Sequence, residues 1–136
     1  MADTAVVTNK IPTSSPDAST KLGAALNTGG NIETHSGTGG AGVIGIVGGS
    51  VFITDSGVAA LTLAQPVAGA PSAGGNDGQR LTIICTTAQA HTVTTAANGI
   101  KGSKHIITFA AVGDSIELDA FNGVWYVVGT PTAVVS

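Results

Sequence analysis

The stretch that decides the fold is residues 79–129, QRLTIICTTAQAHTVTTAANGIKGSKHIITFAAVGDSIELDAFNGVWYVVG. β-Branched and aromatic residues dominate its apolar runs, and Gly, Asn and Asp fall at the breaks, a composition typical of strands and turns. Asn122-Gly123 stands between two such runs and indicates a hairpin, because both central residues of a type I′ turn need a positive φ. We predict strands at residues 79–87, 90–95, 105–109, 114–121 and 124–129.

Strand-like segments also precede this stretch. Residues 43–47 and 50–54 are short apolar runs, and residues 57–63 place Leu61 and Leu63 on one face of a strand. No segment with a helical period interrupts residues 50–129. Short strands with glycine-rich turns and no intervening helices are typical of sandwiches and barrels. The sequence therefore predicts an all-β fold, a small antiparallel β-sandwich or β-barrel with an extended, glycine-rich N-terminal arm.

The composition changes near residue 43. Residues 1–42 contain two prolines and the glycine-rich run at 37–42, and their few large apolar residues follow no sustained period. Such a segment cannot bury enough surface to offset its own ordering entropy. We expect residues 1–42 to be an arm that orders on a neighbouring subunit, and residues 43–136 to be the β-domain. The alternative for the first segment is a disordered tail, and residues 17–26 could form one short helix.

The chain carries unusually little charge. Of its 136 residues only 10% are charged, against about 25% in typical soluble domains. Because a soluble monomer normally spreads charge over its exposed face, we expect this protein to bury surface against copies of itself or a partner. The five aromatic residues make a thin core, for which oligomerisation is a standard remedy. The alternative is a monomer kept soluble by Thr, Ser, Asn and Gly.

The charge pattern and cysteine content exclude several classes. The net charge is −3 and the five basic residues are scattered, so we expect no nucleic-acid binding, which needs a clustered basic face. Cys85 is the only cysteine and cannot form an intramolecular disulfide. The polar start predicts no secretory signal, hence a cytoplasm-like compartment or release by lysis. The longest apolar stretch, residues 41–53, is too short and glycine-rich to span a bilayer.

Two glycine-rich segments are similar in sequence to phosphate-binding loops. Residues 37–42 match G-x-G-x-x-G literally, but the dinucleotide motif needs a strand before it and a helix after it. Here polar coil precedes the run and an apolar strand follows, so we interpret it as a flexible linker. Residues 74–78 lack the Lys-Ser/Thr of a phosphate loop. Neither segment predicts a nucleotide site.

Candidate catalytic and metal-binding residues are few. His35, His91 and His105 are spread along the chain without a carboxylate at metal-ligand spacing, and the single acidic cluster is Asp114, Glu117 and Asp119. Glu117 and Asp119 share a strand face opposite to Ile116 and Leu118, which indicates a solvated face. A glycosidase needs two carboxylates across a cleft, and no Gly-x-Ser-x-Gly elbow is present. We predict no catalytic residue, no cofactor and no metal site, and therefore no enzyme.

Five motifs lie within residues 57–129: LTLAQP at 61–66, NDGQRLTI at 76–83, TAQAHTVTT at 87–95, VGDSI at 112–116 and NGVWYVV at 122–128. With these motifs, this part of the chain resembles small structural proteins of tailed bacteriophages. The motifs at 112–116 and 122–128 are also similar to the closing hairpin of some fibre modules. The resemblance implies a capsid decoration (cement) protein or a head- or tail-fibre domain, commonly trimeric, without catalytic residues.

We therefore expect a capsid decoration protein, assembled in the host cytoplasm, that trimerises on the outer surface of the phage head. It would stabilise the shell by bridging capsomers of the major capsid protein. Contacts are expected at the arm and at loops 65–78 and 96–104. The alternative is a fibre or receptor-binding module that attaches to host glycan. Trp125 and Tyr126 point to opposite faces of their strand, although both are more simply interpreted as core and interface residues. A polysaccharide depolymerase is disfavoured by the short chain and the missing carboxylate pair.

Overall fold

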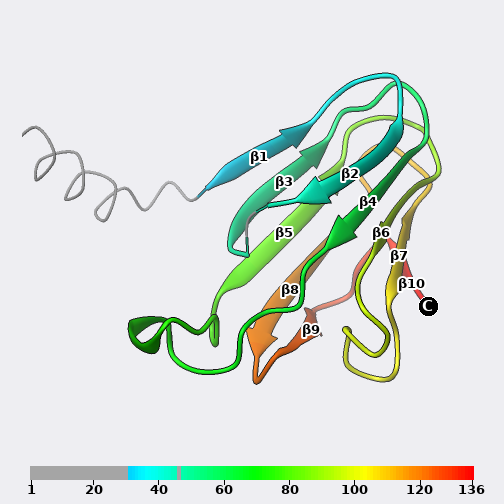
Figure 1. Ribbon diagram of the computed structural model, residues 1–136. Helices are drawn as coiled ribbons and strands as arrows, with labels where there is room; N and C mark the ends of the chain where they lie inside the picture. Colours follow the sequence, from blue (N-terminus) through cyan, green and yellow to red (C-terminus); the bar gives the residue numbers. More distant parts are fainter. Residues whose placement is uncertain (1–30, 46) are drawn as a thin grey trace, which may run out of the picture. The chain divides into compact units, whose positions relative to one another are not determined.

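Two five-stranded sheets packed face to face make up the described part of the protein (Figure 1). A computed structural model describes residues 31–45 and 47–136. One sheet, called sheet A, contains in spatial order β1 (Ile32–His35), β3 (Gly49–Ile53), β5 (Arg80–Cys85), β8 (Ser115–Phe121) and β9 (Val124–Val128). Sheet B contains β10 (Val134–Val135), β7 (Ile106–Phe109), β6 (His91–Thr94), β4 (Ala59–Leu63) and β2 (Gly40–Ile44). The remaining element is the short 3₁₀ helix η1 (Pro71–Ala73).

This arrangement confirms the predicted all-β sandwich, and the sheets do not close into a barrel. Within residues 31–45 and 47–136, no helix is long and apolar enough to cross a membrane.

The prediction of antiparallel sheets is wrong for the first six strands. The chain alternates between the sheets from β1 to β6, and each strand lies parallel to the one two places earlier. Ile32 lies opposite Ser50 and Gly40 opposite Ala59, so one turn of this winding takes eighteen or nineteen residues. The next turn is longer because it contains the loop at residues 64–79. From β6 onward the remaining pairs are antiparallel.

The β-domain begins earlier than the boundary at residue 43 that composition suggested. Strands β1 and β2 start at Ile32 and Gly40, and β2 runs beside β4 in sheet B. A larger residue at position 42 would force the buried Leu61 side chain to shift, because a Cβ there would stand only 2.7 Å from Cδ2 of Leu61. The glycine-rich segment therefore allows close packing of a strand. The rest of the expected arm, including the possible helix at 17–26, lies outside the described residues.

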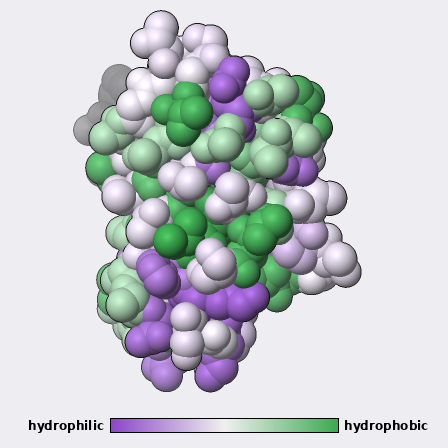
Figure 2. All heavy atoms as spheres, turned by 90° about the vertical axis from the view of Figure 1, so that its right-hand side faces the viewer, coloured by the Kyte–Doolittle hydropathy of each residue, from purple (hydrophilic) through white to green (hydrophobic). Residues whose placement is uncertain are grey.

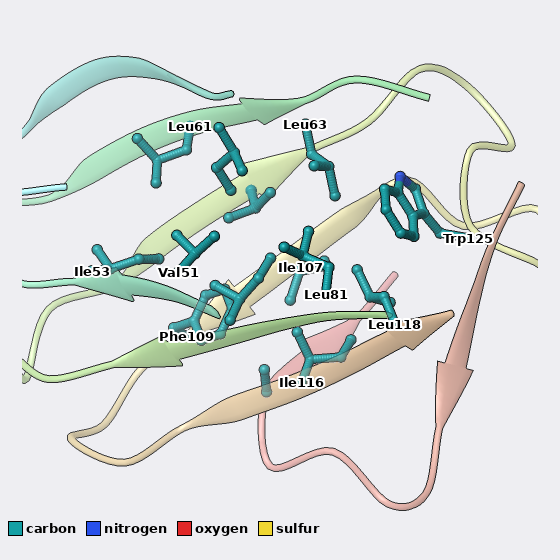
Figure 3. Packing of buried hydrophobic residues seen from close by; sticks show 14 of the residues in the cluster. Val51, Ile53, Leu61, Leu63, Leu81, Ile107, Phe109, Ile116, Leu118 and Trp125 are labelled. Atoms are coloured by element: carbon teal, nitrogen blue, oxygen red, sulfur yellow. The ribbon is translucent and has the colours of Figure 1, made fainter. Parts of the chain in front are cut away.

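The core lies between the sheets and is built from alternate residues of each strand. Phe109, Ile107, Leu118 and Leu81 are fully buried there (Figure 3). Cys85 is also buried, and its thiol donates to the carbonyl of Thr87 at 2.9 Å. Since inward and outward positions alternate strictly along a strand, the same pattern determines which residues each sheet presents outside.

The predicted hairpin at Asn122-Gly123 joins β8 to β9. Both residues have positive φ, 49° and 77°, as a type I′ turn requires. The N–H of Asn122 donates to Oδ1 of Asp77 at 2.7 Å, which ties the hairpin to the loop at residues 64–79. This end of the sandwich is therefore held by contacts between segments distant in sequence.

Candidate functional site

His91 is a buried structural residue at the start of β6. Its Nδ1 accepts a hydrogen bond from the N–H of Ala59 at 3.0 Å, so the ring proton belongs on Nε2. Nε2 lies 2.8 Å from Oγ1 of Thr87, and that hydroxyl donates to the carbonyl of Asp55 at 2.7 Å. Burial lowers the pKa of His91, against a smaller opposite effect of the Asp55 carboxylate. Every polar atom of the ring is used in holding strands together.

His35 and Glu33 face inward from β1 at the edge of sheet A. Nε2 of His35 lies 2.6 Å from Oε1 of Glu33, and the Glu33 carboxylate also accepts from the N–H of Gly45 at 2.9 Å. The two side chains are 16% and 20% exposed. The Glu33 carboxylate thus links β1 of sheet A to the residue that follows β2 of sheet B.

The three histidines do not assemble into a site. His35, His91 and His105 belong to three separate positions, on β1, on β6 and just before β7. Within residues 31–45 and 47–136, no group of three His, Cys, Asp or Glu side chains is arranged to hold a metal ion.

The acidic cluster divides into two separate contacts. Arg80 forms a bidentate pair with Asp119, at 2.8 and 3.1 Å, and its Nη1 lies 2.9 Å from Oε1 of Glu117. The guanidinium lowers the pKa of Asp119. Asp114 instead accepts from the N–H groups of Ala110 and Ala111. Glu117 and Asp119 lie on the outer face of sheet A, as predicted, and they are paired with Arg80 across neighbouring strands.

The glycine-rich runs are packed structural segments. The N–H of Gly39 donates to Oδ1 of Asp55 at 3.3 Å, and a Cβ at Gly39 would stand 2.5 Å from the carbonyl oxygen of Val58. The interpretation of residues 37–42 as a flexible linker is therefore wrong for this fold. In the loop at residues 64–79, Val67 and Asn76 bind each other twice. Neither run leaves a row of free N–H groups for a phosphate.

Hydroxyl groups connect successive turns of the winding at one end of the sandwich. Thr54 donates to the carbonyl of His35, Ser56 to that of Gly37, and Thr86 to that of Ile53, at 2.9, 3.0 and 3.0 Å. Each of these carbonyls also accepts a hydrogen bond from the backbone N–H of the same donor residue, so each hydroxyl adds a second bond where the strands end. Sequence reasoning missed this ladder, because its members meet only once the parallel winding is known.

Among the described residues, the outer face of sheet B carries no charged side chain. Register and alternation give two rows across its strands, Ala41–Ala60–Thr92–Thr108–Val134 and Val43–Thr62–Thr94–Ile106. We call these nine residues the neutral face. Hydrophobic and near-neutral residues cover most of the side where β7 and β10 lie, and hydrophilic residues gather mainly at its lower end (Figure 2). Val43 and Val134 are 67% and 65% exposed.

A second surface feature combines aromatic rings with a cation. Phe121 is 58% exposed and meets Tyr126 edge to face, with ring centroids 6.3 Å apart. Nζ of Lys101 lies 5.9 Å from the Tyr126 ring centre. Trp125 and Tyr126 do point to opposite faces, since Trp125 is fully buried. Phe121 was missed as a surface residue, although alternation with Leu118 and Ala120 indicates that it faces outward.

A scan against protein-family models and a search of curated proteins found no match. The function must therefore be inferred from the surfaces and contacts described above.

Proposed function

We propose that the protein is a capsid decoration protein that trimerises on the outer surface of a phage head and bridges neighbouring capsomers. The neutral face is the observation that supports this proposal most strongly. This surface is suited to contact with another protein. It supports the proposal together with the resemblance of residues 57–129 to phage structural proteins. The proposed role is mechanical: the bridging subunits help the shell resist the internal pressure of packaged DNA.

The neutral face is suited to burial against another protein. Removing a charged side chain from water carries a large penalty unless it is paired, and none of the nine residues is charged. Threonine hydroxyls can exchange water for partner hydrogen bonds, and the alanine and valine side chains gain from leaving water. A surface of this kind favours a neighbour that is also neutral, which a second copy of the same chain supplies.

Open strand edges offer further contacts. Within residues 31–45 and 47–136, the outer edges of β1 and β2 pair with no other strand. An exposed edge presents unpaired N–H and C=O groups and readily accepts another strand. β1 begins directly after Asn31, the first described residue. The open edges allow contact with a neighbouring subunit or the shell.

Charge placed on the neutral face tests the proposal. Thr94→Lys puts an ammonium group in the middle of this face, and Thr82→Lys makes the same change on the outer face of sheet A. We expect Thr94→Lys to reduce retention on stripped phage shells strongly and to weaken trimerisation, while Thr82→Lys retains both. Equal retention of both variants would contradict the role of the neutral face.

The exposed Phe121–Tyr126 pair favours a second candidate, a fibre or receptor-binding module that attaches to glycan. The location of the protein on the particle distinguishes this candidate from a decoration protein.

A further inference from the structure

Phe121 lies at the end of β8, with more than half of its surface in solvent. A phenyl ring gains free energy by leaving water, and its register partner Val124 and its neighbour Tyr126 do not cover it. The interplanar angle with Tyr126 is 65°. An edge-to-face pair leaves ring surface that a flat stack would hide, and that surface is available to a ligand.

Lys101 brings a positive charge to the same place. Its Nζ lies near the Tyr126 ring, and within the described residues no carboxylate forms a salt bridge with it. Arg80, two strands away from β9 in sheet A, is by contrast fully engaged with Glu117 and Asp119. Lys101 is therefore a cation without a protein anion, and it stands beside exposed aromatic surface.

A hollow adjoins the aromatic pair. It is lined by Asn98, Ile100, Lys101, Gly102, Ser103 and Val124. Ile100 and Val124 are its apolar lining residues, and Asn98, Lys101 and Ser103 are lining residues with polar side chains. Because Val124 is opposite Phe121 in the hairpin and Lys101 contacts Tyr126, the hollow and the rings form one continuous surface.

The loop that carries these polar groups is fixed to β9. The N–H of Lys101 donates to the carbonyl of Trp125 at 2.8 Å, and the N–H of Trp125 donates to that of Gly99 at 2.9 Å. Asn98, Ser103 and Asn122 are the non-glycine residues with positive φ in the described chain, and all three lie in this loop or in the adjoining hairpin. Sparsely populated backbone conformations are often held at binding sites. The loop is thus ordered before any ligand arrives.

We infer that Asn98, Lys101, Ser103, Phe121 and Tyr126 form a binding site for an acidic saccharide, a pyranose ring carrying a carboxylate. One face of a pyranose presents C–H groups that suit an aromatic ring, whose face is electron-rich. Its hydroxyl groups suit the amide and hydroxyl of the hollow, and its carboxylate suits the ammonium of Lys101. The site does not depend on the capsid proposal, since either a head protein or a fibre can carry it.

The test is to add sugar probes to ¹⁵N-labelled full-length protein and to monitor binding through the NMR shifts of its backbone amides. The probes are oligosaccharides containing galacturonate, glucuronate or sialate, each compared with its neutral methyl ester. We expect at least one acid to cause saturable shifts confined to residues 98–103 and 121–126. Its ester should bind about tenfold more weakly, as loss of one charge-assisted contact predicts.

Variants separate the roles of ring and charge. Phe121→Leu keeps an apolar side chain but removes the ring, and should reduce binding of acid and ester alike. Lys101→Gln should abolish the difference between acid and ester, whereas Lys104→Gln, in the same loop but outside the hollow, should preserve it. The proposal is overturned if no acid gives saturable shifts, if acid and ester bind equally, or if residues 121–126 are covered by self-association without any sugar.

Discussion

Nε2 of His91 lies 2.8 Å from Oγ1 of Thr87, in the middle of a chain of hydrogen bonds that joins β6 to Ala59 on one side and to Asp55 on the other. This geometry requires a neutral ring, because Nδ1 must accept from the N–H of Ala59. A second proton on the ring would place an N–H donor at Nδ1 against the N–H donor of Ala59. The folded protein therefore resists protonation of His91.

The first prediction is a loss of stability in mild acid. The pKa of His91 is lowered by burial from its ordinary value of 6.5, so below about that pH the unfolded chain binds a proton that the folded chain resists. Stability should fall as the pH decreases from 7 through the unfolded pKa towards the lower folded pKa. Urea unfolding at several pH values measures this slope. His91→Gln should show a shallower slope, and an unchanged slope would mean that His91 does not cause it.

The second prediction concerns Trp125, which is fully buried and donates from Nε1 to the carbonyl of Ala64 at 3.0 Å. Trp125→Ala should cost about 3–5 kcal/mol of unfolding free energy, because it opens a cavity between the sheets. Trp125→Phe keeps most of the packing and should cost less, although it leaves the Ala64 carbonyl without its donor. Chemical unfolding measures both. A Trp125→Ala protein with unchanged stability would show that this ring is not a core residue.

The third prediction tests the glycine-rich strand β2. Gly42→Ala should destabilise the protein by about 1–3 kcal/mol, because the new methyl group would overlap Leu61 and force this buried side chain to move within the core. Gly45→Ala is the matched control, since the nearest atom to its Cβ is 3.5 Å away. Thermal unfolding of the two variants compares them. Equal stabilities would mean that residues 40–44 do not pack as described.

The fourth prediction concerns truncation. Deleting residues 2–42 removes β1 and most of β2, so it exposes the inner faces of β3 and β4 and should prevent stable folding. Deleting residues 2–30 leaves both sheets complete and should preserve a cooperative unfolding transition. Circular dichroism and thermal unfolding test the pair. A stable protein lacking residues 2–42 would restore the boundary at residue 43.

The shorter deletion also tests the arm. If residues 1–30 order on a neighbouring subunit or on the shell, the protein lacking residues 2–30 should be retained poorly on stripped shells. Coupled ordering costs a few kcal/mol but covers a wide surface. Retention equal to that of the full-length protein would show that these residues are a passive tail.

Strands β3 to β9 were predictable because their inward residues are large and apolar, as at Leu81, Ile83 and Leu118. The two-residue strand β10 was not predicted. The directions of neighbouring strands were not predictable, because side chains alternate with a period of two in both parallel and antiparallel pairs. Strand β1 was missed for a different reason. Its inward residues are Glu33 and His35, and their pairing inside the sandwich replaces the apolar pattern that reveals a strand.

The candidate surfaces were predictable only in part. The low charge of the chain indicated a neutral contact surface, but Thr62 and Thr94 become neighbours only through the parallel pairing of β4 and β6. Phe121 lies outside the core by simple alternation, whereas its contact with Tyr126 and the nearby Lys101 depends on how the loop at residues 96–104 returns to β9. The alternation of residues predicts which face of a single strand is exposed. Which exposed residues of different strands become neighbours depends on the topology of the sheets.

The most direct test of the central proposal is immunogold labelling of purified phage particles with an antibody raised against the full-length chain. A decoration protein predicts label spread evenly over the outer surface of the head and lost from particles stripped of the protein. Label confined to the tail or to fibres, or its absence from intact particles, would contradict the proposal.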